Sequence, residues 1–181
     1  SGNTDNVFGI DPDFGELFIA NNTGLDFEIN PTFSLGITVS DGINTSAEEI
    51  VSITLNDLND NIPSIADPGV ISVDENSAAG TEIVVFTPID ADANSTFTWG
   101  IATGNIDLDG DGNLPFAIGA DSGVLAINDT DDFDYESVTE YSLVISLSDG
   151  ENSSDNPFTV FVNDILETIT VTSVDLITNE V

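Results

Sequence analysis

The chain of 181 residues contains no lysine, arginine, histidine, cysteine or methionine, but it contains 34 aspartate and glutamate residues. Nucleic acids and anionic membrane surfaces are bound through cationic side chains, so the composition excludes both as partners. Without histidine and cysteine there is no imidazole base, no thiolate nucleophile and no tetrahedral zinc site. The ligands that remain are oxygen atoms, which suit calcium, magnesium or manganese. We therefore expect a hard divalent cation as the partner of these carboxylates.

Long hydrophobic runs are also missing. None approaches the length of about 18 residues that a membrane span requires, so no membrane insertion is expected in this segment. The chain is nevertheless not a disordered acidic tail, because 40% of its residues are hydrophobic and 11 are phenylalanine. We expect it to bury a core. The absence of methionine indicates a piece cut from a longer protein.

Several short runs alternate apolar and polar residues with a period of two, which is typical of strands with one buried and one exposed face. The clearest are Phe33–Val39, Val51–Leu55, Tyr141–Leu147 and Phe158–Val162. Asp-Gly, Ser-Gly and proline-containing turns separate such runs, and no long segment has helical periodicity. The pattern predicts an all-β fold of tandem immunoglobulin-like Greek-key β-sandwiches.

The same pattern occurs twice along the chain. Positions 26 and 134, like positions 41 and 149, differ by 108 and carry the same residue. The residues of the first copy that recur at this offset are Phe8, Ile10, Gly15, Leu17, Ile19, Asp26, Glu28, Leu35, Ile37, Asp41 and Gly42. The sequence therefore predicts two copies of one domain type.

The second copy is expected to be complete over residues 64–164, a length typical of a seven-stranded sandwich. Residues 1–57 would form the C-terminal part of a first copy, residues 58–63 a linker, and residues 165–181 a linker and the first strand of a following element. Two explanations of the short first copy stay open. Its boundaries are artificial, or strands of a neighbouring chain complete it, because an inner face at Phe33, Leu35 and Ile37 would otherwise be exposed.

The segment Asp57–Pro63 between the copies fits the pattern DxNDNxP, and with it the chain resembles the cadherin repeat family in its microbial cadherin-like form. Further motifs stand in the expected order. Leu25–Glu28 resembles the LDRE motif, Asp90–Asp92 the DxD motif and Asp74–Asn76 the opening acidic motif. Asp41 and Asp149 each resemble the acid at the end of strand F. Together these motifs are specific, and they cover nearly the whole chain up to Asp164.

The resemblance implies that calcium ions bind where the two copies meet. The implied ligands, through the backbone oxygen for Leu58 and Asn61, are Asp26, Glu28, Leu58, Asn59, Asp60, Asn61, Asp90, Asp92 and Asp149. A second junction, at the far end of the second copy, would use Glu75, Asp134 and Glu136. Its linker, Asn163–Glu167, lacks the NDN portion, so fewer ions are expected there, with Glu167 as an alternative ligand.

The residue types suit this role on physical grounds too, because calcium takes about six to eight oxygen ligands. Side chains two residues apart in an extended stretch point the same way, so we expect Asp26 with Glu28, and Asp90 with Asp92, to face one gap. Charges about 4 Å apart repel by roughly 4 kcal/mol at an effective dielectric constant of about 20. A cation between the carboxylates would offset that repulsion.

The loop Asp107–Asn113 is a second candidate, because its alternating aspartates and glycines resemble the first half of an EF-hand loop. The twelfth position is Ile118 and not a bidentate glutamate, which excludes a complete EF-hand. A plain polar loop and a minor local calcium site both stay open. For Trp99, the only tryptophan, core packing is favoured over a sugar-stacking platform.

We expect no enzyme, because the paired carboxylates of a glycosidase should not recur at a 108-residue offset. The favoured hypothesis is a calcium-dependent extracellular segment of a cell-surface adhesin or filament, since calcium outside cells matches dissociation constants of about 10⁻⁴–10⁻³ M. Its partners would be calcium ions and neighbouring repeats of the same or an identical chain, in a strand-complemented or head-to-tail assembly. The alternative is a carbohydrate-binding accessory module of a secreted polysaccharide-degrading enzyme, which would need exposed Trp99 and Tyr135.

Overall fold

The structure, a computed structural model, describes residues 1–166, so the expected ligand Glu167 and the strand expected beyond it lie outside the described residues. The chain divides into two compact units. Unit 1 comprises Ser1–Ser64, Pro88–Phe97 and Ser148–Ser154. Of the described residues, unit 2 comprises Ile65–Thr87, Thr98–Leu147 and residues 155–166. The repeat boundaries expected at residues 57, 63 and 164 stay a prediction, since unit 1 also includes two segments of the second copy.

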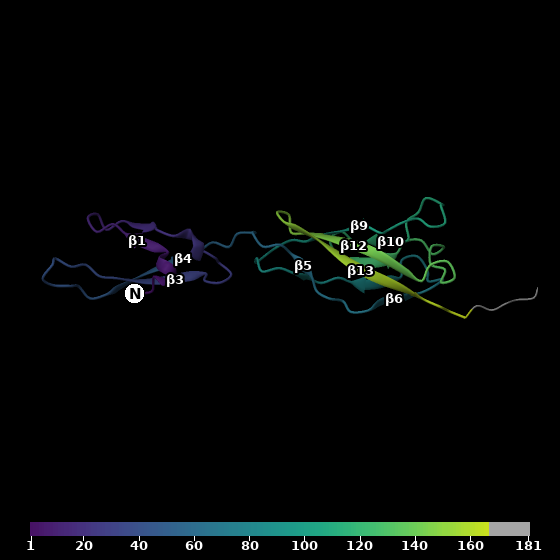
Figure 1. Ribbon diagram of the computed structural model, residues 1–181, viewed down its shortest axis with the longest axis horizontal. Helices are drawn as coiled ribbons and strands as arrows, with labels where there is room; N and C mark the ends of the chain where they lie inside the picture. The colour runs from purple at the N-terminus through teal and green to yellow at the C-terminus, as the bar shows by residue number, and fades with distance from the viewer. Residues whose placement is uncertain (167–181) are drawn as a thin grey trace, which may run out of the picture. The chain divides into compact units, whose positions relative to one another are not determined.

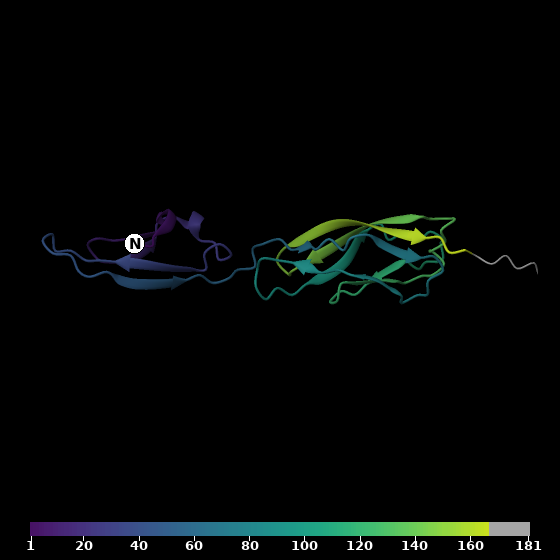
Figure 2. The same cartoon turned by 90° about the horizontal axis from the view of Figure 1, so that it is seen from below.

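Unit 2 contains a β-sandwich of seven strands (Figure 1). One sheet has the strand order β6–β13–β12–β9, and the other has the order β10–β11–β7. The strands are β6 (Ile71–Asp74), β7 (Glu82–Val85), β9 (Thr98–Thr103), β10 (Phe116–Ile118), β11 (Val124–Ile127), β12 (Glu140–Ser148) and β13 (Ser153–Asn163). The long strands β12 and β13, yellow-green to yellow, run side by side in both views (Figure 2). The all-β sandwich predicted from alternation is confirmed.

The alternation of β12 sets the core of this sandwich. Tyr141, Leu143, Ile145 and Leu147 occupy every second position and are buried, because successive strand residues point to opposite faces. Trp99 of β9 is buried too, and its ring stacks on Phe86 with the ring centroids 6.0 Å apart. The prediction that Trp99 packs in the core is therefore confirmed.

Unit 1 contains two hairpins and a small core. Strand β1 (Phe8–Ile10) pairs with β2 (Leu17–Ile19), and β3 (Thr32–Ile37) pairs with β4 (Glu49–Thr54). Short 3₁₀ turns, η1 (Thr4–Asn6) and η2 (Asn22–Gly24), flank the first hairpin. A further pair of two-residue strands, β5 (Ser64–Ile65) and β8 (Pro88–Ile89), forms a sheet of its own.

The expected exposure of Phe33 and Leu35 is wrong. Their side chains are only 3% and 4% exposed, because Val7 and Phe8 cover them. The rings of Phe8 and Phe33 meet edge to face, with centroids 5.0 Å apart. Ile37 is partly buried against the same cluster, so a short first copy still closes a core of its own.

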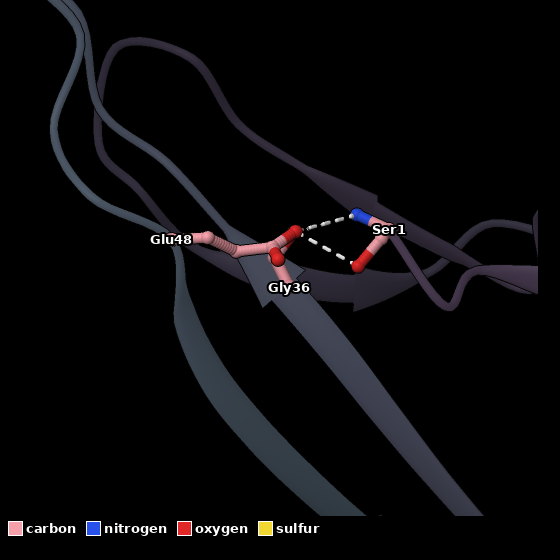
Figure 3. A network of polar contacts seen from close by, with 3 residues as sticks. All are labelled: Ser1, Gly36 and Glu48. Atoms are coloured by element: carbon pink, nitrogen blue, oxygen red, sulfur yellow. Dashed lines mark hydrogen bonds and ion pairs between the residues drawn. The ribbon is translucent and has the colours of Figure 1, made fainter.

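The N-terminal amino group provides the one ion pair among the described residues (Figure 3). Ser1 N donates to Gly36 O over 3.0 Å and lies 3.3 Å from Glu48 Oε1, while Ser1 Oγ donates to the same carboxylate over 2.8 Å. The hydroxyl hydrogen bond, followed by the amino group's hydrogen bond and charge, lowers the pKa of Glu48. This end of the chain is thereby tied to β3.

Candidate metal centre

The acids expected to bind calcium meet in unit 1, around the irregular segment that follows β4. Carboxylate oxygens of Asp90, Asp92 and Asp149 lie within 4.8 Å of one another. Oxygens of Glu28, Asp57 and Asp92 form a second such group. Asp92 belongs to both groups, so five acids from four separate stretches of sequence form one continuous cluster.

Backbone and side-chain amides fix the two buried acids of this cluster. Asp92 is 7% exposed, and its two oxygens accept from Asn61 N over 2.9 Å and from Asn61 Nδ2 over 2.6 Å. Asp149 is 4% exposed and lies in the turn between β12 and β13, where its Oδ1 accepts from Glu151 N over 2.9 Å and Asn152 N over 2.6 Å. These donors orient the carboxylates and leave the Oδ2 atom of Asp149 facing the cluster.

Two oxygens in the cluster have no hydrogen-bond partner among the described residues. Asp57 Oδ2 accepts from Ala93 N over 2.9 Å, but its Oδ1 is buried and unpaired. Asp90 Oδ1 accepts from Asp92 N over 3.2 Å, but its Oδ2 is buried and unpaired as well. A buried polar atom is normally satisfied, and the chain has no cationic side chain that could supply a partner. A bound cation, a proton or an ordered water molecule would satisfy such oxygens.

The side-chain amide of Asn59 also faces this cluster. Its oxygen faces Asp92 Oδ2 and Asp149 Oδ2, each at 3.1 Å. Without a cation, the amide would gain two hydrogen bonds by turning its nitrogen to these carboxylates. Asn59 is therefore placed either to donate to both carboxylates or to offer its amide oxygen beside them as a further metal ligand.

Two expectations about local geometry are wrong. Asp26 and Glu28 lie in a turn and not in an extended stretch, because Asp26 Oδ1 accepts from Ile29 N over 2.9 Å and Asp26 O accepts from Asn30 N. Asp90 and Asp92 follow β8 in a bend, where they still come together. Strand alternation is therefore not what aligns either pair.

The remaining expected ligands line an open pocket of unit 1 of about 600 Å³. Its wall includes Asp26, Glu28, Leu58, Asp60 and Asn61. Asp26 shares this pocket with Glu28 although it belongs to neither carboxylate group described above. Leu58 O already accepts from Asp60 N over 3.0 Å, which leaves one lone pair for another partner. Whether these residues bind calcium stays a prediction.

Asp57 was missed as a ligand by the sequence analysis. One of its oxygens belongs to the group with Glu28 and Asp92, and its Oδ2 accepts from Ala93 N. The signal was present, because Asp57 is the first residue of the DxNDNxP segment.

Electrostatics confirm that the cluster is crowded with like charge. The backbone N–H of Glu28 lowers the pKa of its carboxylate, but desolvation and the charges of Asp60, Asp92 and Asp57 outweigh it, and the pKa is raised. Desolvation raises the pKa of Asp149, but the amides of Asn152 and Glu151 outweigh it, and that pKa is lowered. The carboxylate form of Glu28 is therefore destabilised by its surroundings.

The acids of the expected second junction also meet, within unit 2. Oxygens of Glu75, Asp134 and Glu136 lie within 4.8 Å of one another. Glu75 is 3% exposed, yet both of its oxygens are satisfied, by Tyr135 N over 2.8 Å and by Ile165 N over 2.6 Å. This group therefore lacks the unpaired buried oxygens of the cluster in unit 1.

No helix in the described part of the chain is long and apolar enough to cross a membrane. In this part of the chain the carboxylates gather into clusters, and no cationic side chain is present to neutralise them.

Comparison with known proteins shows which family the chain resembles. A family model described as a cadherin domain matches residues 70–163. Human Protocadherin-23 is 29% identical over 177 residues, which are 97% of this chain and 5% of that protein. Protein dachsous of Drosophila melanogaster is 35% identical over 151 residues, which are 80% of this chain and 4% of that protein. The chain thus spans only a small part of these relatives.

A solved structure with the same fold is the protocadherin gammaB7 EC3-6 cis-dimer. It superposes with a TM-score of 0.73 at 24% sequence identity, over 88% of this chain and 39% of that chain.

Proposed function

Because the chain belongs to the cadherin family, we propose that it is a calcium-dependent segment of an extracellular adhesin or filament, in which cations bind the acidic cluster and stiffen successive repeats. The expected cadherin-repeat family and β-sandwich fold are confirmed by the comparisons, whereas the microbial form stays a prediction. One observation carries the proposal: the cluster in unit 1 holds two buried carboxylate oxygens, on Asp57 and Asp90, with no partner in the described chain.

The residues present fit a hard cation. Carboxylates of Glu28, Asp57 and Asp92 would hold one ion, and those of Asp90, Asp92 and Asp149, with the amide oxygen of Asn59, would hold another. A bound cation supplies positive charge that the side chains lack entirely. The chain's own part is to fix the oxygens with amide donors, as Asn61 does for Asp92.

The group around Glu75 would bind calcium more weakly than the cluster in unit 1. Both Glu75 oxygens accept backbone hydrogen bonds, so a cation would have to share or displace those donors. This agrees with the expectation of fewer ions at the second junction.

The proposed role is structural and not enzymatic. Its partners would be calcium ions and neighbouring repeats of the same or an identical chain, in head-to-tail assembly, at the cell surface or outside the cell. Strand complementation loses its reason, because Phe33 and Leu35 are already buried within unit 1. No observation favours the carbohydrate-binding alternative, since Trp99 is buried at 5% exposure and Tyr135 is half-buried beside Glu75.

The proposal is tested by thermal unfolding of the chain after chelation and after return of calcium. Calcium at tenfold its dissociation constant adds about 1.4 kcal/mol per site, and each 1 kcal/mol shifts Tm by about 4–8 °C in a domain of this size. Tm should therefore rise by several degrees when calcium is returned. Asp92→Asn should remove most of that rise, because Asp92 belongs to both carboxylate groups.

Asp13→Asn is the matched control, because Asp13 is an exposed acid of the same unit outside every carboxylate group of the described chain. It should keep the full response to calcium. Melting curves that coincide with and without calcium would refute the proposal.

A further inference from the structure

The loop that begins at Asp107 is an insertion in the second copy. Gly2 and Gly104 occupy equivalent places, since both have positive φ, of 75° and 88°, and a Cβ at either would lie 2.0 Å from a backbone oxygen of β3 or β12. Those oxygens belong to Ser34 and Ser142, which stand at the 108-residue offset. Between these glycines and their next strands, however, the copies differ in length.

The asparagine after each glycine makes the same contacts in both copies. Asn3 Nδ2 donates to Phe8 O and its Oδ1 accepts from Phe8 N, and Asn105 makes the same two hydrogen bonds with Phe116. Four residues separate Asn3 from Phe8, whereas ten separate Asn105 from Phe116. The second copy therefore carries six extra residues at this point, and they fall in its Asp- and Gly-rich loop.

The inserted acids meet two others from the turn that follows β11. Oxygens of Asp107, Asp109 and Asp132 lie within 4.8 Å of one another, and so do oxygens of Asp109, Asp111 and Asp129. All five residues lie in unit 2. They are distinct from the junction acids, because none of them belongs to the groups around Asp92 or Glu75.

A buried oxygen points to a ligand in this group. Asp132 is 3% exposed, its Oδ1 accepts from Leu108 N over 2.9 Å, and its Oδ2 has no hydrogen-bond partner in the described residues. Asp129 Oδ2 is likewise buried and unpaired. A buried carboxylate oxygen facing two further carboxylates is unfavourable unless a cation completes it.

The first copy has neither part of this arrangement. At the 108-residue offset, Asp129 and Asp132 correspond to Asn21 and Gly24. The junction acids Asp134 and Glu136, by contrast, correspond to Asp26 and Glu28. The inserted loop and its two supporting carboxylates are therefore present together in one copy and absent together in the other.

We propose that the second copy contains an additional calcium site, local to unit 2, formed by Asp107, Asp109 and Asp111 of the inserted loop with Asp129 and Asp132. The aspartates alternate along the loop as oxygen ligands do in calcium-binding loops, and Gly110 and Gly112 take the positive φ values of 82° and 99° that its tight path requires. Asp132 supplies the distal carboxylate that the sequence lacks at position 118.

Like charges gather around the loop. The N–H of Asp111 lowers the pKa of Asp109, but desolvation and the charge of Asp111 lead the opposing effects, and the pKa is raised. The site also has a support in the core, because Tyr141 Oη donates to the backbone oxygen of Asp132. Desolvation, followed by the charge of Asp132, raises the pKa of Tyr141.

The test is calorimetric titration of the chelated, full chain with calcium chloride. The double variant Asp109→Asn/Asp111→Asn changes exposed loop residues and should lower the calcium stoichiometry by one while leaving the fold intact. Asp132→Asn should weaken the same step by about tenfold or more, since one ligand charge is lost. Asp121→Asn is the control, because it removes an exposed charge of unit 2 outside every group of the described chain.

A variant of the cluster in unit 1 separates this proposal from the proposed function. Asp92→Asn should leave the loop step in place, so failure of this proposal and failure of the proposed junction sites give different results. Terbium used in place of calcium should give emission sensitised by Tyr141, and Tyr141→Phe should reduce that emission without changing the stoichiometry. If the double variant, with Trp99 emission unchanged, binds as many calcium ions as the parent chain, the inference is overturned.

Discussion

The hairpins β1–β2 and β10–β11 have the same register but different surroundings. Phe8 stands opposite Ile19 in the first, and Phe116 stands opposite Ile127 in the second, at the 108-residue offset. Strand β11 also pairs with β7, whereas β2 pairs only with β1 in the described chain. Ile127 is 1% exposed, and Ile19 is 58% exposed. The local sequence is thus sufficient to form the hairpin in both copies. Which of its side chains are buried depends on whether a further strand and sheet pack beside it.

The largest expected effect on stability comes from truncating core leucines at equivalent positions of the two copies. Leu143→Ala should lower the free energy of unfolding of unit 2 by about 2–5 kcal/mol, because Leu143 is 1% exposed inside a seven-stranded sandwich. Leu35→Ala should cost less, because its described cluster has three other buried residues and the hydrophobic residues around that cluster are only partly buried.

Hydrogen exchange, resolved along the chain, would measure both losses separately, and Trp99 fluorescence would follow unit 2 alone. Equal losses at the two leucines would contradict the difference in surroundings.

A second pair of substitutions probes what the copies share. Gly104→Ala and Gly2→Ala should each lower the local stability of their own unit by about 1–3 kcal/mol, because both glycines have positive φ and the same 2.0 Å approach to a backbone oxygen. Exchange rates of β12 and β3 would report the effect. Gly110→Ala is the control, since it has positive φ without any neighbour within 4 Å, and it should cost less than Gly104→Ala.

The smallest expected effect is that of pH on the calcium-free chain. Glu28 in unit 1, and Asp109 and Glu136 in unit 2, have raised pKa values in the folded state. A group whose pKa is raised in the folded state stabilises the fold at low pH. This stabilisation is lost as the pH rises through the pKa that the group has in the folded state. Mild acidification from neutral pH should therefore raise Tm slightly. The gain ends where Glu48 and then Asp149, whose pKa values are lowered, begin to lose their stabilising charge below their ordinary values of 4.5 and 3.8.

Calcium should reverse that trend, because protons then compete with the cation for the same oxygens. Melting curves at several pH values, with chelator and with calcium, would check both signs. A Tm of the chelated chain that falls steadily from pH 7 to pH 5 would contradict the crowding of like charge.

Much of the fold could be predicted because alternation is a local property. The run Tyr141–Leu147 lies within β12, and Phe158–Val162 lies within β13. The meeting of Asp90 with Asp92 could also be predicted, although the reason was wrong. Asp26 and Glu28 form a turn because Asp26 accepts hydrogen bonds from residues three and four positions later, which strand periodicity does not encode.

The acids that meet the inserted loop from elsewhere in the chain could not be predicted, because no motif marks them. Asp132 reaches the loop of Asp107 across more than twenty residues, and its hydrogen bond from Leu108 N exists only after the sandwich has formed. Nothing in the sequence near Asp132 distinguishes it from Asp131, which is exposed. Burial separates the two, and burial is a property of tertiary structure.

The parallel pairing of β13 with β6 has a mechanical consequence. Val160 to Asn163 run alongside Ile71 to Asp74 in the same direction, so the chain enters the sandwich at one end of this ladder and leaves at the other. Tension applied through the polypeptide would pull these two strands past each other and would load their hydrogen bonds all at once, in shear, instead of peeling them apart one by one. A repeat built in this way resists stretching along the direction in which the polypeptide advances.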